Sequence, residues 1–152
     1  PTGNGSTGQA IKGDGSGNLS WSTYTEDGSG NFAFNSGYGS AAVAYGCRAW
    51  VNFNGTTASP STIRGSGNVS SVTKNGTGDY TVNFTNALPD ANYTACFGSR
   101  GASISTGNYT ATFENRDSVG RTTSTLRLYT LYTVTGTSGA VDAEVVSVAI
   151  FR

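Results

Sequence analysis

Apolar and polar residues alternate along most of the chain from residue 47 onward. In the run CRAWVNFN at 47–54, Cys47, Ala49, Val51 and Phe53 share one face, which is the two-residue period of a half-buried strand. Turn residues separate this run from seven other strand-like runs, at 62–65, 69–74, 79–85, 93–99, 109–115, 122–134 and 143–152. Eight short strands in about a hundred residues predict an all-β domain, a jelly-roll-like β-sandwich.

Residues 1–46 follow a different pattern, with frequent glycines and only short apolar groups between them. The pentapeptide DGSGN occurs at 14–18 and again at 27–31, and each copy precedes an apolar-small-aromatic triplet, LSW or FAF. Because DGSGN is a strong tight-turn signal, we predict two short β-hairpins in tandem. The expected organisation is therefore a glycine-rich shaft or trimerisation segment at 1–46 and a C-terminal sandwich domain at 47–152.

The predicted hairpins are too short to bury their own apolar side chains. Either the C-terminal domain covers them, or identical chains pack around an axis, and the tandem repeat favours the second arrangement. The small residues at 40–45 suit a close approach of backbones at such an axis, but equally a short helix or a buried strand. The residues expected to pack in a homotrimer are Ile11, Leu19, Trp21, Phe32, Phe34, Val43 and Tyr45.

The final strand-like run is nearly continuous in its apolar character over 144–151. Such a run predicts a central strand, or a strand that an interface covers on its second face. Composition agrees with the β assignment, since Gly, Thr, Ser and Asn make up half of the chain. The chain lacks Met and begins with Pro1, so we expect a fragment or a processed piece whose upstream neighbour is missing.

Charge and side-chain chemistry exclude several function classes. Nine Lys and Arg balance nine Asp and Glu, so the chain has no excess of positive charge that would bind nucleic acid or an anionic membrane surface. The absence of His excludes Ser-His-Asp and Cys-His catalysis and His-based zinc sites. A glycosidase-like carboxylate pair is conceivable, but the acidic residues of the strand-rich part lie near turns or strand ends. We expect no enzyme, no cofactor and no membrane insertion.

Two further motifs have both a structural and a functional interpretation. DGSGN resembles the first half of a calcium loop, but Leu19 and Phe32 stand where the loop needs Gly, and its Glu is absent. We therefore expect turns and no metal. Cys47 and Cys96 both fall in predicted strands; buried free thiols are the expectation, and one disulfide is the alternative.

Polar loops supply the candidate binding residues. If the strands run strictly up and down, the loops at 55–61, 75–78, 100–108 and 135–142 share the end far from residue 46, and present a polar surface that suits sugar hydroxyls or a polar protein. The candidates are Thr57, Ser59, Asn75, Arg100, Ser103, Ser105, Asn108, Thr137 and Ser138. Asp90, Arg116, Asp117 and Arg121 then lie at the opposite end, in a structural role.

Several segments resemble bacteriophage tail-fibre and related virion proteins. Residues 8–21, GQAIKGDGSGNLSW, are similar to a Gly-Gln-x-Leu-x-x-Asp-Gly-x-Gly-x-Leu-x-Trp segment of these proteins. Residues 48–55, 63–72, 75–84, 88–93 and 146–151 resemble the C-terminal domain of phage fibres, including those of marine and cyanobacterial phages. The resemblance covers most of the chain.

The resemblance implies a homotrimer on a virion, whose C-terminal β-domain forms a fibre tip or knob in contact with the host surface. Its partners would be a cell-surface receptor, glycan or protein, and other tail proteins through the upstream part. It transfers no catalytic residue. The sequence leaves open two other functions, a purely structural spike or connector and a polysaccharide-degrading tailspike.

Overall fold

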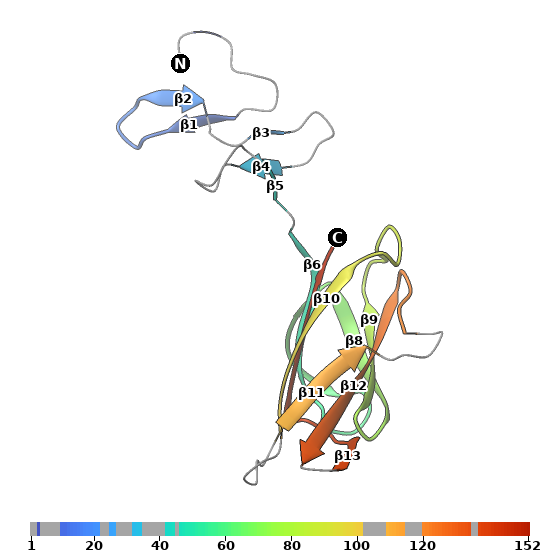
Figure 1. Cartoon of the computed structure of the whole chain (residues 1–152). Helices are drawn as coiled ribbons and strands as arrows, with labels where there is room; N and C mark the ends of the chain where they lie inside the picture. The colour runs from blue at the N-terminus through green and yellow to red at the C-terminus, as the bar shows by residue number, and fades with distance from the viewer. Residues whose placement is uncertain are drawn as a thin grey trace. The chain divides into compact units, whose positions relative to one another are not determined.

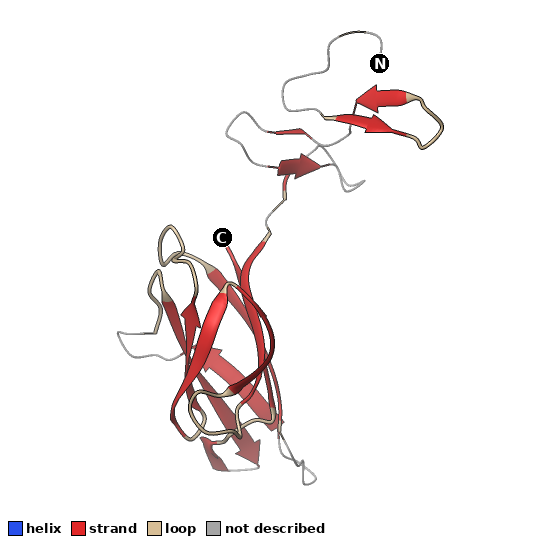
Figure 2. Cartoon of the chain, turned by 180° about the vertical axis from the view of Figure 1, so that it is seen from behind, coloured by secondary structure: helices blue, strands red, loops and turns tan. Residues whose placement is uncertain are grey.

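The computed structural model describes residues 3, 10–21, 25–26, 32–34, 42–44, 46–101, 109–114, 120–134 and 137–152. All of the regular structure in these residues is β-strand, as Figure 2 shows, so the predicted all-β class is confirmed. No helix among them is long and apolar enough to cross a membrane. The chain divides into two compact units, Pro1–Tyr45 and Gly46–Arg152.

The first unit contains the hairpin β1 (Ile11–Gly13) and β2 (Leu19–Trp21), in which Ile11 lies opposite Trp21. The first DGSGN copy forms its turn: Asp14 Oδ1 accepts hydrogen bonds from the backbone N–H of Ser16 (2.8 Å) and Asn18 (3.1 Å). Gly15 and Gly17 take φ of 79° and 89°, which favours glycine at both positions. The motif is thus a turn, as expected; the second copy, at 27–31, lies outside the described residues.

A second small sheet joins β3 (Thr25–Glu26), β4 (Phe32–Phe34) and β5 (Ala42–Val43) in that order. β3 and β4 pair antiparallel on either side of the second DGSGN copy. β5 pairs with β4, so residues 42–43 of the small-residue run form a strand rather than a helix.

The second unit is a β-sandwich (Figure 1). One sheet has the order β10-β14-β6-β7, and the other has the order β11-β12-β9-β8 with β13 also paired to β12. Neighbouring strands in the sequence pair as hairpins within each sheet, as β6–β7, β8–β9 and β11–β12 do. The bounds are β6 (Cys47–Asn54), β7 (Thr62–Gly67), β8 (Val69–Gly76), β9 (Asp79–Phe84), β10 (Thr94–Arg100), β11 (Tyr109–Glu114), β12 (Thr125–Val134), β13 (Thr137–Ala140) and β14 (Val145–Phe151).

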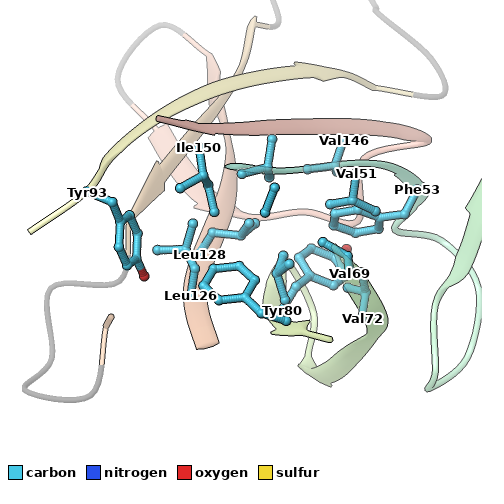
Figure 3. Close-up of a cluster of buried hydrophobic side chains, with 14 of the residues drawn as sticks. Val51, Phe53, Val69, Val72, Tyr80, Tyr93, Leu126, Leu128, Val146 and Ile150 are labelled. Carbon is cyan, nitrogen blue, oxygen red and sulfur yellow. The ribbon is translucent and has the colours of Figure 1, made fainter. Parts of the chain in front are cut away.

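The core lies between the two sheets and is filled by the inward residues of the alternating strands (Figure 3). Val51 and Phe53 of β6 and Val146 and Ile150 of β14 face the side chains of the other sheet. Two aromatic pairs pack edge to face, Phe53–Tyr80 with ring centroids 5.1 Å apart and Phe84–Tyr93 at 6.0 Å. The two-residue period of the sequence is therefore the period of burial.

Several details differ from the sequence-based expectation. The strand expected at 122–134 begins at Thr125, because Thr122 Oγ1 accepts hydrogen bonds from the N–H groups of Ser124 and Thr125 and folds 122–124 into a turn. β13 lies within the expected loop 135–142. Cys47 and Cys96 are free, as expected, but both are exposed rather than buried. The final strand, β14, is central, between β10 and β6.

Candidate functional site

The described parts of the loops expected at one end of the sandwich do lie at the same end. Successive strands from β6 to β12 alternate in direction, so the β6–β7, β8–β9 and β10–β11 connections fall at the end opposite Gly46. β13 lies at this same end, away from the C-terminus (Figure 1). We call this the loop end: residues 55–61, 76–78, 101 and 137–144 among those described.

Asp142 holds the base of the loop end together. Its carboxylate accepts hydrogen bonds from Lys74 Nζ (2.7 Å) and from the N–H of Gly78 (2.8 Å). Tyr80 Oη lies 2.8 Å from Asp142 Oδ1 and 3.0 Å from the carbonyl oxygen of Gly55, to which Lys74 also donates at 3.1 Å. The network therefore links three connections that are far apart in the sequence.

Two glycines make this network possible. A Cβ on Gly55 would lie 2.5 Å from Tyr80 Oη and 2.7 Å from the carbonyl oxygen of Ala143. Gly78 has φ of 69°, and its Cβ would lie 2.5 Å from the carbonyl oxygen of Thr130. The backbone therefore approaches these groups more closely than any side chain would allow.

The ionisation of the network groups follows from burial and hydrogen bonding. Burial opposes ionisation of the Asp142 carboxyl, but the hydrogen bonds from Lys74, Gly78 and Tyr80 outweigh it and lower the pKa of Asp142. Burial, and then the hydrogen bond to Asp142, raises the pKa of the Tyr80 hydroxyl. Asp142 is thus a carboxylate and Tyr80 a neutral phenol at neutral pH, which suits a rigid support better than proton transfer.

Three of the predicted binding residues form side-chain hydrogen bonds to other residues of the sandwich. Thr57 Oγ1 donates to the carbonyl of Asn54 (2.9 Å) and accepts from the N–H of Thr62 (2.8 Å). Ser59 Oγ accepts from the N–H of Lys74 at 3.1 Å. Asn75 Nδ2 donates to Thr81 Oγ1 (2.9 Å) and Asp79 Oδ1 (3.2 Å). These hydrogen bonds shape the loops, while Ser59 and Asn75 are exposed and Thr57 is half-buried.

The remaining predicted residues divide into exposed and undescribed ones. Arg100 is 66% exposed and forms an ion pair with Glu144 across 3.3 Å. Thr137 and Ser138 are exposed on β13, so the loop expected there is a strand that presents two hydroxyl side chains. Ser103, Ser105 and Asn108 lie outside the described residues.

At the opposite end, Asp90 and Arg121 have the structural role that was expected of them. Arg121 pairs with Glu114, donates to the carbonyl of Tyr93 and lies over the Tyr93 ring, 5.0 Å from its centroid. Burial raises the pKa of Tyr93 to about 12. Asp90 pairs with Arg152, and Arg116 and Asp117 lie outside the described residues.

The stability of the sandwich is expected to be constant between about pH 5 and 8 and to fall in acid. The chain has no His. The hydrogen bond from Arg127 lowers the pKa of Asp79 despite its burial, as the network does for Asp142. The pKa of each of these carboxyls is lower in the folded state than in the unfolded state, where it is about 3.9. Their contribution to stability is therefore fully present above about pH 3.9 and is lost as the pH falls through their pKa values in the folded state.

Urea unfolding at a series of pH values measures this dependence. Asp79→Asn is expected to reduce stability at pH 7, because Arg127 loses its carboxylate, and to flatten the acid limb. A stability transition between about pH 5.5 and 7.5 would contradict the assignment, because no group described above titrates there.

No protein-family model and no curated relative matches the sequence. The fold is similar to that of the tailspike of phiAB6, solved in complex with three-repeated oligosaccharides of Acinetobacter baumannii surface polysaccharide. The two chains superpose with a TM-score of 0.50 at 17% sequence identity, over 99% of this chain and 28% of the tailspike chain. This chain thus spans just over a quarter of the tailspike's length, and it has a fold found in a phage tail protein.

Proposed function

We propose that this chain is the tip of a trimeric phage tail fibre that attaches to the host surface by binding surface polysaccharide or another outer-membrane component without cleaving it. The likeness in fold to a tailspike that was solved with surface-polysaccharide oligosaccharides carries the proposal. The resemblance of the sequence to the C-terminal domain of phage fibres points in the same direction. The polar loop end offers hydroxyl, amide and guanidinium groups, which suit sugar hydroxyls.

The trimer is supported by the apolar side chains of the first unit. Ile11 and Leu19 are 54% exposed and Phe32 is 52% exposed within one chain. Trp21 and Val43, also expected at the trimer contact, are half-buried. The Phe34 side chain and Tyr45 lie outside what the structure describes. Three exposed large apolar residues in so small a unit favour a partner surface, and a tandem hairpin repeat favours identical partners.

Attachment without hydrolysis is supported by the carboxylates of the second unit. The described side-chain carboxylates, at Asp79, Asp90, Glu114, Asp142 and Glu144, each form an ion pair with Arg or Lys. A glycosidase needs a protonated acid and a second carboxylate on either side of a scissile bond. A cation partner favours the ionised form of a carboxyl group, which opposes the role of the protonated acid.

Adsorption competition with purified chain tests this proposal. The chain is expected to bind host cells, to reduce phage adsorption in proportion to its concentration, and to release no new reducing ends from envelope polysaccharide. Release of reducing ends would instead establish a degrading tailspike. Assembly without cell binding or competition would favour a purely structural spike or connector.

A further inference from the structure

The outer face of the β10-β14-β6-β7 sheet carries a tryptophan that packs over two glycines of β7. Trp50 of β6 is 46% exposed and points away from the core, because its neighbours Ala49 and Val51 point into it. Gly67 of β7 is its cross-strand partner, and a Cβ there would lie 2.5 Å from Trp50 Nε1. A Cβ on Gly65 would lie 3.2 Å from Trp50 Cη2. The indole therefore lies directly over the backbone of β7.

The sheet surface around Trp50 consists mostly of small residues. The strand registers place Cys96, Ala149, Trp50 and Gly67 in one row across the sheet. The neighbouring row is Gly98, Ser147, Asn52 and Gly65, in which Asn52 Nδ2 donates to Ser147 Oγ at 2.8 Å. Trp50 is thus the one large side chain in these two rows, and a flat ligand can reach the face of its ring that points away from β7.

Two arginines without an ion-pair partner lie on the strands that carry Trp50 and its two glycines. Arg48 lies two residues before Trp50 on the same face of β6. Arg64 donates to the carbonyl of Glu144 (2.8 Å) and lies 3.5 Å from Asn52 Oδ1. Among the described Lys and Arg of 46–152, Arg48 and Arg64 form no ion pair, whereas the other five do: Lys74, Arg100, Arg121, Arg127 and Arg152.

We propose that this face binds an acidic saccharide that carries a carboxylate, such as a uronic acid residue. The apolar C–H face of one pyranose ring stacks on Trp50, and carboxylates of this residue and of its neighbour in the saccharide bind Arg48 and Arg64. The polar row of Asn52 and Ser147 hydrogen-bonds the ring hydroxyls. The site rests on the proposed attachment function, and it adds to that function both a ligand class and a sheet face separate from the loop end.

Charge complementarity favours this occupant over the sandwich unit of a second copy. Each described side-chain carboxylate of 46–152 already has a cationic partner, so this unit of a neighbouring copy brings no free described carboxylate to Arg48 and Arg64. A neutral saccharide would stack on Trp50 but would leave the two arginines without a partner. The combination of ring and charges therefore selects an acidic sugar.

Calorimetric titration of the full chain with tetragalacturonate, and with its methyl ester as the neutral probe, tests the site. The wild-type chain is expected to bind the acid form more tightly. Trp50→Ala is expected to weaken binding of both probes about tenfold or more. R48Q/R64Q is expected to bring the two affinities to about the same value. Phe113→Ala, at an aromatic side chain that is 53% exposed on β11, and Lys12→Gln are the matched controls and should change neither.

Several outcomes would overturn the site. They are no binding of tetragalacturonate by the wild-type chain, binding by Trp50→Ala as tight as by the wild type, or loss of binding in Phe113→Ala.

Iodide quenching of the assembled chain tests whether another copy covers this face, with W50F to distinguish the Trp50 signal from that of Trp21. A Trp50 that is protected from iodide would mean that the face is an interface. An array of bacterial polysaccharides, together with the adsorption assay, separates the two proposals. If Trp50→Ala binds tetragalacturonate and its array ligands like wild type, the site is wrong and attachment stands. If the wild type neither binds host cells nor reduces phage adsorption, but loses tetragalacturonate with Trp50→Ala, attachment is wrong and the site stands.

Discussion

Tyr80→Ala is expected to lower the free energy of unfolding by about 4 kcal/mol, as truncations of large buried aromatics commonly do. The Tyr80 side chain is fully buried and packs edge to face on Phe53, with ring centroids 5.1 Å apart. Its hydroxyl lies within hydrogen-bonding distance of Asp142 and the carbonyl of Gly55. Truncation therefore removes core volume and a link to the loop end in one change.

Tyr80→Phe separates these two contributions. The ring stays in the core, and Lys74 still donates to both Asp142 and Gly55. We therefore expect a loss of about 1–2 kcal/mol, the usual effect of removing one buried hydrogen-bonding group. Urea unfolding measures both variants. Phe113→Ala, an aromatic truncation at an exposed site, should stay within about 0.5 kcal/mol of wild type. A Tyr80→Ala loss no larger than that of Phe113→Ala would contradict the described core.

The sequence predicts the strands well because burial follows a strict period in this domain. The core-facing residues are two positions apart, as Val51 and Phe53 are on β6 and Val146, Val148 and Ile150 are on β14. The pattern fails where local hydrogen bonding competes with strand formation, as in the turn at Thr122. It also fails at β13, because the sequence TSGA is as typical of a loop as of a strand.

The sites are harder to predict because they depend on contacts between distant residues. Asp142 meets Lys74 and Gly78 from 68 and 64 residues away, and the sequence gives no local signal for either contact. The exposed position of Trp50 follows from the alternation in CRAWVNFN. The packing of Trp50 over glycines does not follow from the alternation, because it depends on the register that brings Gly67 opposite Trp50. Alternation identifies the face of a strand, and register identifies its neighbours.

The proposed trimer implies that the triple variant I11S/L19S/F32S will be a monomer under conditions in which the wild-type chain has about three times 15.6 kDa by light scattering. These side chains are 52–54% exposed in one chain. Fully burying an apolar side chain of this size contributes about 1.5–3 kcal/mol, and about half of each side chain is left to be buried on assembly. Losing nine of them from a trimer therefore removes on the order of 10 kcal/mol of assembly energy. The sandwich should keep its unfolding transition, because the substitutions lie in the other unit.

Phe113→Ser is the matched control for this variant, since it makes an equally exposed aromatic residue polar in the sandwich. It should leave the trimer intact, which would show that assembly depends on the hairpins and not on exposed apolar surface in general. A monomeric wild-type chain would overturn the shaft hypothesis, because Ile11, Leu19 and Phe32 would then have no partner copies to cover them. A triple variant that stays trimeric would place the contact on the remaining trimer residues, such as Trp21 and Val43, or in the second unit. In the second unit the outer faces of the two sheets would be the candidates, and the iodide accessibility of Trp50 would show whether the β10-β14-β6-β7 face is covered.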